Sequence, residues 1–141
     1  MSGEPAGKVR LLDAEPSLAR GIERGRQDDA RESLITDVIR IEPGPWEEAG
    51  QPPGNPLFLG YLILDGAVTR EIIIAGRPSL ELLGPGDLIR PWIVPEPLDA
   101  MHVTAEWSLI SAGHFAVIDE DFHRQSQEFP SVLTVLMDRV V

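Results

Sequence analysis

The chain has 141 residues, 43% of them hydrophobic, which is enough for one domain with an ordinary core. It contains no cysteine, which excludes disulfide bonds, thiolate zinc sites, cysteine-ligated iron–sulfur clusters and a cysteine nucleophile. Its 23 acidic residues outnumber 12 basic ones, giving a net charge of −11, so we do not expect the chain to bind nucleic acid by itself.

No membrane-spanning or secretory segment is evident in the sequence. A transmembrane helix needs roughly 18 consecutive apolar residues, and no run approaches that length. The N-terminus, MSGEPAGKVR, lacks the apolar region of a secretory signal. We therefore expect a soluble, cytoplasmic protein without membrane contact.

The N-terminal part is predicted to be an arm followed by helices. Residues 1–8 are small, polar and glycine-containing, which predicts a flexible arm. Apolar residues then recur at a spacing of about 3.6 and predict a short amphipathic helix through Leu11, Ala14, Leu18 and Ile22. A second helical stretch is predicted over residues 28–33.

From Leu34 onward, runs rich in isoleucine, valine and leucine alternate with glycine, proline and aspartate, a pattern typical of an antiparallel sandwich or barrel. The predicted strands are residues 34–42, 57–66, 67–76, 79–84, 101–113 and 114–119. Residues 42–56 and 90–99 carry most of the prolines, which lack the amide hydrogen that a central strand requires, so we expect long loops there.

The C-terminal part is predicted to be helical. Asp119 is a suitable N-cap for a short helix, and Pro130 suits the start of a second one. The segment 131–141 has too many apolar residues for a helix with one buried stripe, and the apolar run continues to Val141, as if the helix extended further. One side can pack on the strands and the other on the same helix of a second copy; the alternative is burial within one subunit. The predicted homodimer interface comprises Leu133, Leu136, Met137 and Val140.

The stretch 59–92 resembles the central part of cyclic-nucleotide-binding-like domains of catabolite-activator/FNR (Crp/Fnr) transcription regulators. The residues that carry the resemblance are Tyr61, Ile63, Gly66, Val68, Leu82, Gly86, Asp87 and Ile89. The resemblance covers residues 9–141 and implies a mainly β double-stranded β-helix, or jelly roll, with an N-terminal helix and C-terminal helices. It also implies a ligand-sensing, dimerising module whose helix-turn-helix DNA-binding domain is absent from this chain.

The phosphate-binding cassette that this family places after its Gly-Asp corner is degenerate here. On the family pattern, Arg90 takes the place of a glycine, Pro91 of the ribose-binding glutamate and Trp92 of an aliphatic residue. Asp99 and Ala100 fall near the phosphate-binding arginine and hydroxyl positions. Pro91 cannot accept a ribose hydrogen bond, and a carboxylate repels a cyclic phosphate. We therefore expect either an effector other than cyclic AMP or a roll that serves only as a structural dimerisation platform.

The residues predicted to contact this unidentified small-molecule effector are Leu88, Ile89, Arg90 and Trp92. Arg90 beside Trp92 is the place where a charge and an aromatic face converge. The three tryptophans, Trp46, Trp92 and Trp107, either line a pocket for a flat ligand or cover the ends of the roll.

A small cupin-like jelly-roll enzyme or binding protein is the alternative function. Such a protein needs a His-x-His pair with further ligands, whereas His102, His114 and His123 have no metal-site spacing. No serine or carboxylate pair has catalytic partners at a recognisable spacing. We therefore predict no catalytic residues, no metal and no cofactor, although haem, which some members of the family bind, stays open as a ligand.

Overall fold

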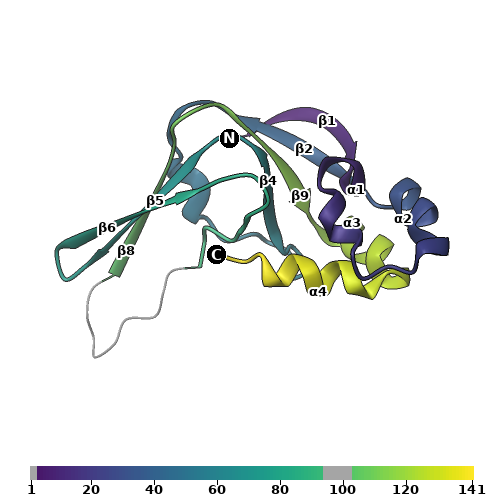
Figure 1. Ribbon diagram of the computed structural model, residues 1–141. Coiled ribbons are helices and arrows are strands. Elements are labelled where there is room, and N and C mark those ends of the chain that lie inside the picture. Colours follow the sequence, from purple (N-terminus) through teal and green to yellow (C-terminus); the bar gives the residue numbers. More distant parts are fainter. Residues whose placement is uncertain (1–2, 94–102) are drawn as a thin grey trace.

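The computed structural model describes residues 3–93 and 103–141, and the strands form a β-roll with the helices gathered at one end (Figure 1). One sheet has the order β1-β2-β9-β4-β7 and the other β3-β8-β5-β6, with antiparallel pairing between neighbours. The strands are β1 (Glu4–Arg10), β2 (Ile35–Ile41), β3 (Gly44–Pro45), β4 (Gly60–Asp65), β5 (Val68–Ile74), β6 (Arg77–Leu83), β7 (Leu88–Ile89), β8 (Val103–Leu109) and β9 (Gly113–Ile118).

The α-helices come from the N-terminal and the C-terminal parts of the sequence. The α-helices are α1 (Leu11–Ala14), α2 (Gln27–Ser33), α3 (Glu120–Gln125) and α4 (Pro130–Asp138). Short 3₁₀ turns are η1 (Pro16–Ala19), η2 (Arg24–Arg26), η3 (Glu47–Gly50) and η4 (Ser126–Glu128). None of these helices is long and apolar enough to cross a membrane. The predicted mainly β jelly roll with flanking helices is confirmed.

Two N-terminal predictions need correction. The expected flexible arm is largely β1, an edge strand whose side chains are mostly exposed, so hydrophobic periodicity gave no sign of it. Backbone pairing with β2 and an ion pair from Lys8 to Asp37 at 2.7 Å hold it. The expected helix over 11–22 is broken at Glu15, whose extended backbone precedes Pro16 at the start of η1.

Two hydrophobic cores lie on either side of the larger sheet, and the neighbouring residues of β7 point into different ones. Leu88 belongs to the core that the helices cover, together with Leu62, Phe122 and Leu136. Ile89 belongs to the core inside the roll. The other members of the roll core are Ile41, Trp46, Ala49, Ile63, Val68, Leu83, Trp107, Leu109 and Phe115. Side chains alternate along a strand, so a two-residue strand suffices to join both cores.

The predicted C-terminal helix is shorter than expected. It ends at Asp138, and the next residues lie alongside β7 in a parallel bridge. Among the described residues, no other strand pairs with this edge of β7. The Leu88 amide donates to the carbonyl of Arg139 at 3.0 Å, and the Val141 amide donates to the carbonyl of Leu88 at 3.1 Å. The last residues therefore satisfy an exposed strand edge instead of extending the helix.

Candidate ligand-binding site

The structure separates the four residues that were predicted to contact an effector. Leu88 and Ile89 both have 0% exposed surface and pair with Leu62 and Tyr61 of β4. They lie in the two cores, so a ligand reaches neither side chain without opening a core. Arg90 and Trp92, in contrast, are half-buried and retain accessible surface.

Arg90 and Trp92 converge as the sequence predicted. The Arg90 Cζ atom lies 5.7 Å from the Trp92 ring centroid, within the range of a cation–π contact. Trp92 packs edge-on against Phe58 at 5.5 Å and against Tyr61 at 6.4 Å. The Arg90 Nε atom is buried and has no hydrogen-bond partner among the described residues.

After the Gly86-Asp87 corner, β7 is followed by a turn from Arg90 to Ile93, where the first described part of the chain ends. The Gly84 amide donates to Asp87 Oδ2 at 2.9 Å, which fixes the corner, and the Ile93 amide donates to the carbonyl of Arg90 at 3.0 Å. Pro91 is buried within this turn. Asp99 and Ala100, which were laid on the phosphate-binding positions, lie outside the described residues.

An aromatic cluster fills the roll behind this turn. The Trp46 ring centroid lies 5.6 Å from Tyr61, 6.5 Å from Trp107 and 5.6 Å from Phe115. Trp46 and Trp107 are buried, and within the described part of the chain neither indole nitrogen has a hydrogen-bond partner. Buried indole N–H groups usually have a partner, so these two donors are unusual. Burial also raises the pKa of the Tyr61 phenol.

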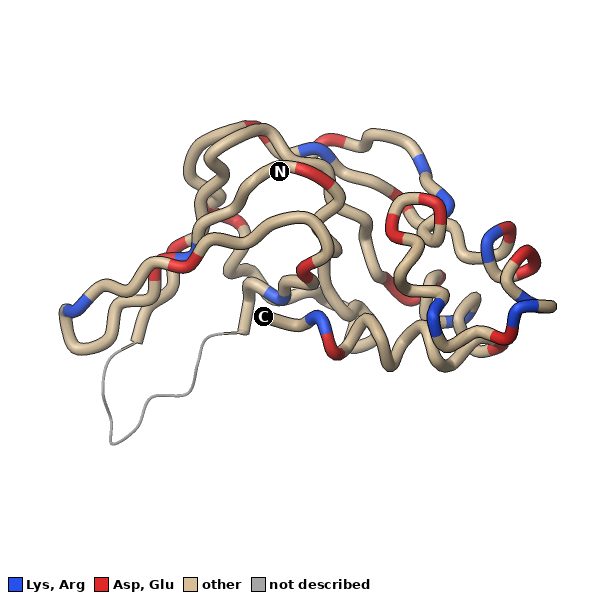
Figure 2. The backbone as a smooth tube through the Cα atoms, in the orientation of Figure 1, with Lys and Arg blue, Asp and Glu red and all other residues tan. Residues whose placement is uncertain are grey.

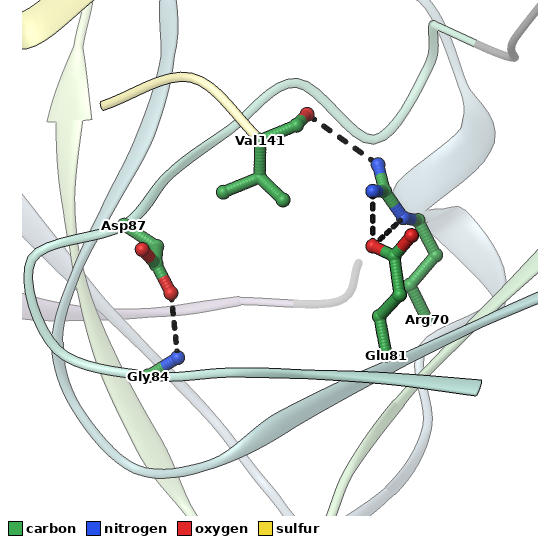
Figure 3. Close-up of polar contacts among 5 residues, drawn as sticks. All are labelled: Arg70, Glu81, Gly84, Asp87 and Val141. Atoms are coloured by element: carbon green, nitrogen blue, oxygen red, sulfur yellow. Dashed lines mark hydrogen bonds and ion pairs between the residues drawn. The ribbon is translucent and has the colours of Figure 1, made fainter. Parts of the chain in front are cut away.

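A charged pair on the inner face of the smaller sheet was missed at the sequence level. Arg70 of β5 lies directly opposite Glu81 of β6 on one side and Trp107 of β8 on the other. Arg70 Nε and Nη2 both donate to Glu81 Oε2 (Figure 3). The available signal was periodicity: Arg70 occupies the same alternating phase as the buried Val68 and Ile72.

The opposite, outer face of the same strands carries an acidic cavity of about 570 Å³. Glu71 of β5 and Glu106 of β8 lie directly opposite each other there, and Glu47 of η3 lines the rim. No lysine or arginine is among its described lining residues. Like charges at directly opposite positions repel, so this cavity is poorly suited to a phosphate or any other anion.

The predicted interface residues of α4 also differ in placement. Leu136 is completely buried in the helix-covered core, so it packs inside its own domain. Leu133 packs partly against that core, whereas Met137 is 43% exposed. Val140, 37% exposed, lies beyond the helix, in a bridge with Leu88. One side of α4 thus covers the domain and the other side leaves apolar surface free.

The two described histidines have separate partners. His114 Nδ1 lies 2.9 Å from Asp65 Oδ1, and His123 Nε2 lies 3.3 Å from the Gln127 side-chain nitrogen. His102 lies outside the described residues. Within residues 3–93 and 103–141, no group of three His, Cys, Asp or Glu side chains is placed to hold a metal ion.

Comparison with known proteins identifies the fold. The sequence matches no protein-family model, and no curated protein sequence is significantly similar to it. Among solved structures, the N-terminal domain of a transcriptional regulator from Streptomyces coelicolor A3(2) is similar at a TM-score of 0.50 and 17% identity, covering 89% of this chain and 86% of that chain. This likeness shows that the chain shares the fold of that domain.

Two further structures are similar at a TM-score of 0.48. The Thermus thermophilus Catabolite Activator Protein has 21% identity, and the match covers 86% of this chain and 55% of that chain. A CooA mutant from Carboxydothermus hydrogenoformans has 14% identity, and the match covers 95% of this chain and 80% of that chain. The chain therefore spans about half the length of the catabolite activator.

Proposed function

We propose that this chain is the effector-sensing and dimerising domain of a transcription regulator, which acts on DNA only through a domain outside this sequence. The observation that carries the proposal is the shared fold with a regulator's N-terminal domain over 89% of the chain. Acidic and basic residues are interspersed along the backbone (Figure 2), and the net charge of −11 supports a sensor rather than a DNA-binding module.

The effector is a small molecule other than a cyclic nucleotide. Pro91 has no amide hydrogen to offer to a phosphate and no side-chain acceptor for a ribose hydroxyl. The turn from Arg90 to Ile93 leaves Arg90 as the single basic residue of that turn, with its side chain over Trp92. A charge on an aromatic face favours a compact ligand with an apolar body over a sugar phosphate.

Thermal unfolding tests the effector class directly. A ligand that binds only the native state stabilises it by about 2.7 kcal/mol at a hundred times its Kd. We expect cyclic AMP and cyclic GMP at millimolar concentration to leave Tm unchanged, while haem and a panel of metabolites are screened alongside. A rise in Tm with cyclic AMP would show that the roll binds a cyclic phosphate through other residues.

The dimer forms through the exposed side of α4 and the residues that follow it. Leu133 and Met137 are one helical turn apart, and Val140 continues the apolar surface beyond the helix. A two-fold axis over this surface buries the same residues from both copies. Placing a charge at its centre opposes association because the charge loses its hydration.

Sedimentation velocity of the wild type and of Met137→Asp tests the dimer. We expect a dimer for the wild type and a monomer with native circular dichroism for the variant. Ile110→Asp is the matched control, because it replaces another exposed apolar residue, 62% accessible, after β8. A wild type that stays monomeric at high concentration, or a Met137→Asp variant that remains dimeric, rules out this interface.

A further inference from the structure

Arg70 is a charged residue on the inner face of the smaller sheet, where its neighbours Val68 and Ile72 are buried apolar residues. Val68, two residues before it, has 0% exposed surface, and Ile72, two residues after it, has 9%. The Arg70 side chain is only 12% exposed, whereas that of Glu81 is 40% exposed. A charged group in such a place is costly unless it is paired, and Glu81 is the pairing carboxylate here.

The pairing of Arg70 is one-sided. A guanidinium has five N–H donors in a planar fork, and Glu81 engages only the edge formed by Nε and Nη2, through a single oxygen. Within residues 3–93 and 103–141, Nη1 has one partner, the carbonyl oxygen of Val141, at 3.4 Å. N–H···O bonds in proteins are usually near 2.9–3.0 Å, so this contact is weak, and the second edge of the fork can accept a better ligand.

The Val141 contact shows where an acceptor oxygen sits on that second edge. Figure 3 shows Val141 between Asp87 and the Arg70–Glu81 pair. Val141 is 40% exposed, so this acceptor oxygen belongs to a residue at the surface of the domain. An incoming carboxylate can take the place of this oxygen from the solvent side.

The surroundings of Arg70 define the chemistry of such a group. The Arg70 Cζ atom lies 5.5 Å from the ring centroid of Trp107, so the guanidinium is held against an aromatic wall. Glu81 already neutralises the cation, and the chain carries a net charge of −11, so a dianionic phosphate meets strong repulsion. A monoanionic carboxylate matches the guanidinium fork and adds less charge.

We propose that Arg70 is the recognition group for the carboxylate of a small organic acid. This deepens the sensor function proposed above and rests on it. Positive charge for an anionic effector thus comes from β5, before the Gly86-Asp87 corner, and the acid takes the place of the Val141 carbonyl oxygen.

Isothermal titration with benzoate and with benzamide tests this assignment, because the two probes differ chiefly in charge. We expect wild-type protein to bind benzoate measurably and benzamide at least tenfold more weakly. Arg70→Gln should weaken benzoate binding about tenfold or more, the loss of one charge-assisted hydrogen bond. Arg77→Gln, the same charge change at the exposed start of β6, should bind as the wild type does.

A double variant, Arg70→Leu with Glu81→Leu, guards against a folding artefact, since it makes this part of the inner face apolar. It should fold and lose benzoate binding. Equal binding of benzoate and benzamide by the wild type, or benzoate binding retained by Arg70→Gln or by the double variant, overturns the assignment. Sedimentation of the same samples separates the two proposals. A wild-type dimer that does not bind benzoate refutes only the acid site, whereas a wild-type monomer refutes the dimerising sensor.

Discussion

The two cores of this domain differ in the polar groups that their own side chains carry. The members of the helix-covered core are aliphatic residues and phenylalanines; of the buried polar atoms near it, Ser126 Oγ donates to the carbonyl of His123 at 2.8 Å, whereas Thr36 Oγ1 and His123 Nδ1 have no partner among the described residues. The roll core contains two tryptophans with unpartnered indole nitrogens and borders the Arg70–Glu81 pair. Both cores lie against the same sheet and share β7.

This difference separates scaffold from site. A core whose members are all apolar gains most from staying closed, because any opening exposes apolar surface to water. A core with unpaired donors and a half-paired cation can gain hydrogen bonds when a polar ligand enters. We therefore assign the helix-covered core to stability and the roll core to recognition, and the following predictions test that division.

Leu136→Ala should have the largest effect on stability. The residue is completely buried in the helix-covered core, and truncating such a leucine costs about 2–5 kcal/mol through lost burial and the cavity left behind. Chemical denaturation of the variant measures the loss. Leu82→Ala, at a side chain 69% exposed on β6, is the control and should change stability by less than about 0.5 kcal/mol. A loss below about 1 kcal/mol at Leu136 would mean that the helix-covered core is loosely packed.

Glu81→Leu should have an intermediate effect on stability, because it leaves Arg70 without its counter-ion on the inner face. Since Glu81 is 40% exposed and water reaches it, we expect a loss of about 1–3 kcal/mol, less than for a fully buried pair. Adding Arg70→Leu should restore stability to the wild-type value or above it. Chemical denaturation of the single and double variants gives the interaction free energy between Arg70 and Glu81. If the stability losses of the two substitutions simply add up in the double variant, Arg70 and Glu81 do not stabilise each other and the prediction is wrong.

Much of this fold was predictable because its signals are local. The strands β2, β4, β5, β8 and β9 follow runs rich in isoleucine, valine and leucine, and the Asp119 cap follows from residue type. The two-residue strands β3 and β7 were not predicted, and β3 lies in the expected loop 42–56. The edge strand β1 was not predictable, because it is held by backbone pairing and exposes most side chains. The end of α4 at Asp138 was not predictable either, because the strand edge of β7 with which Val140 pairs exists only in the folded domain.

The site was only partly predictable for the same reason. Arg90 and Trp92 are neighbours in sequence, so their convergence could be anticipated. Arg70, Glu81 and Trp107 come from three strands and meet only through the register of the sheet. Leu88 and Ile89 were predicted as ligand contacts from their place after the Gly86-Asp87 corner, yet a two-residue strand between two cores buries both.

Asp119→Ala should reduce stability by about 1 kcal/mol. The Asp119 Oδ1 atom accepts from the Phe122 amide at 3.1 Å at the start of α3, which positions the buried Phe122 ring in the helix-covered core. Asp119→Asn retains the cap and is the control in the same denaturation experiment. If the alanine and asparagine variants unfold together, the cap contributes nothing and packing alone holds α3.

The smallest effect should come from Tyr61, which borders the roll core and is the only tyrosine in the chain. Burial raises the pKa of its phenol above the usual 10.0, so the folded state favours the neutral form. The stability that this preference gives is fully present below pH 10 and is lost as the pH rises through the folded-state pKa. The ultraviolet absorbance of the phenolate reports Tyr61 alone, and Tyr61→Phe should remove both the titration and the alkaline loss of stability. A pKa at or below 10.0 would show that water already reaches the roll core beside Trp46, which would weaken the contrast between the two cores.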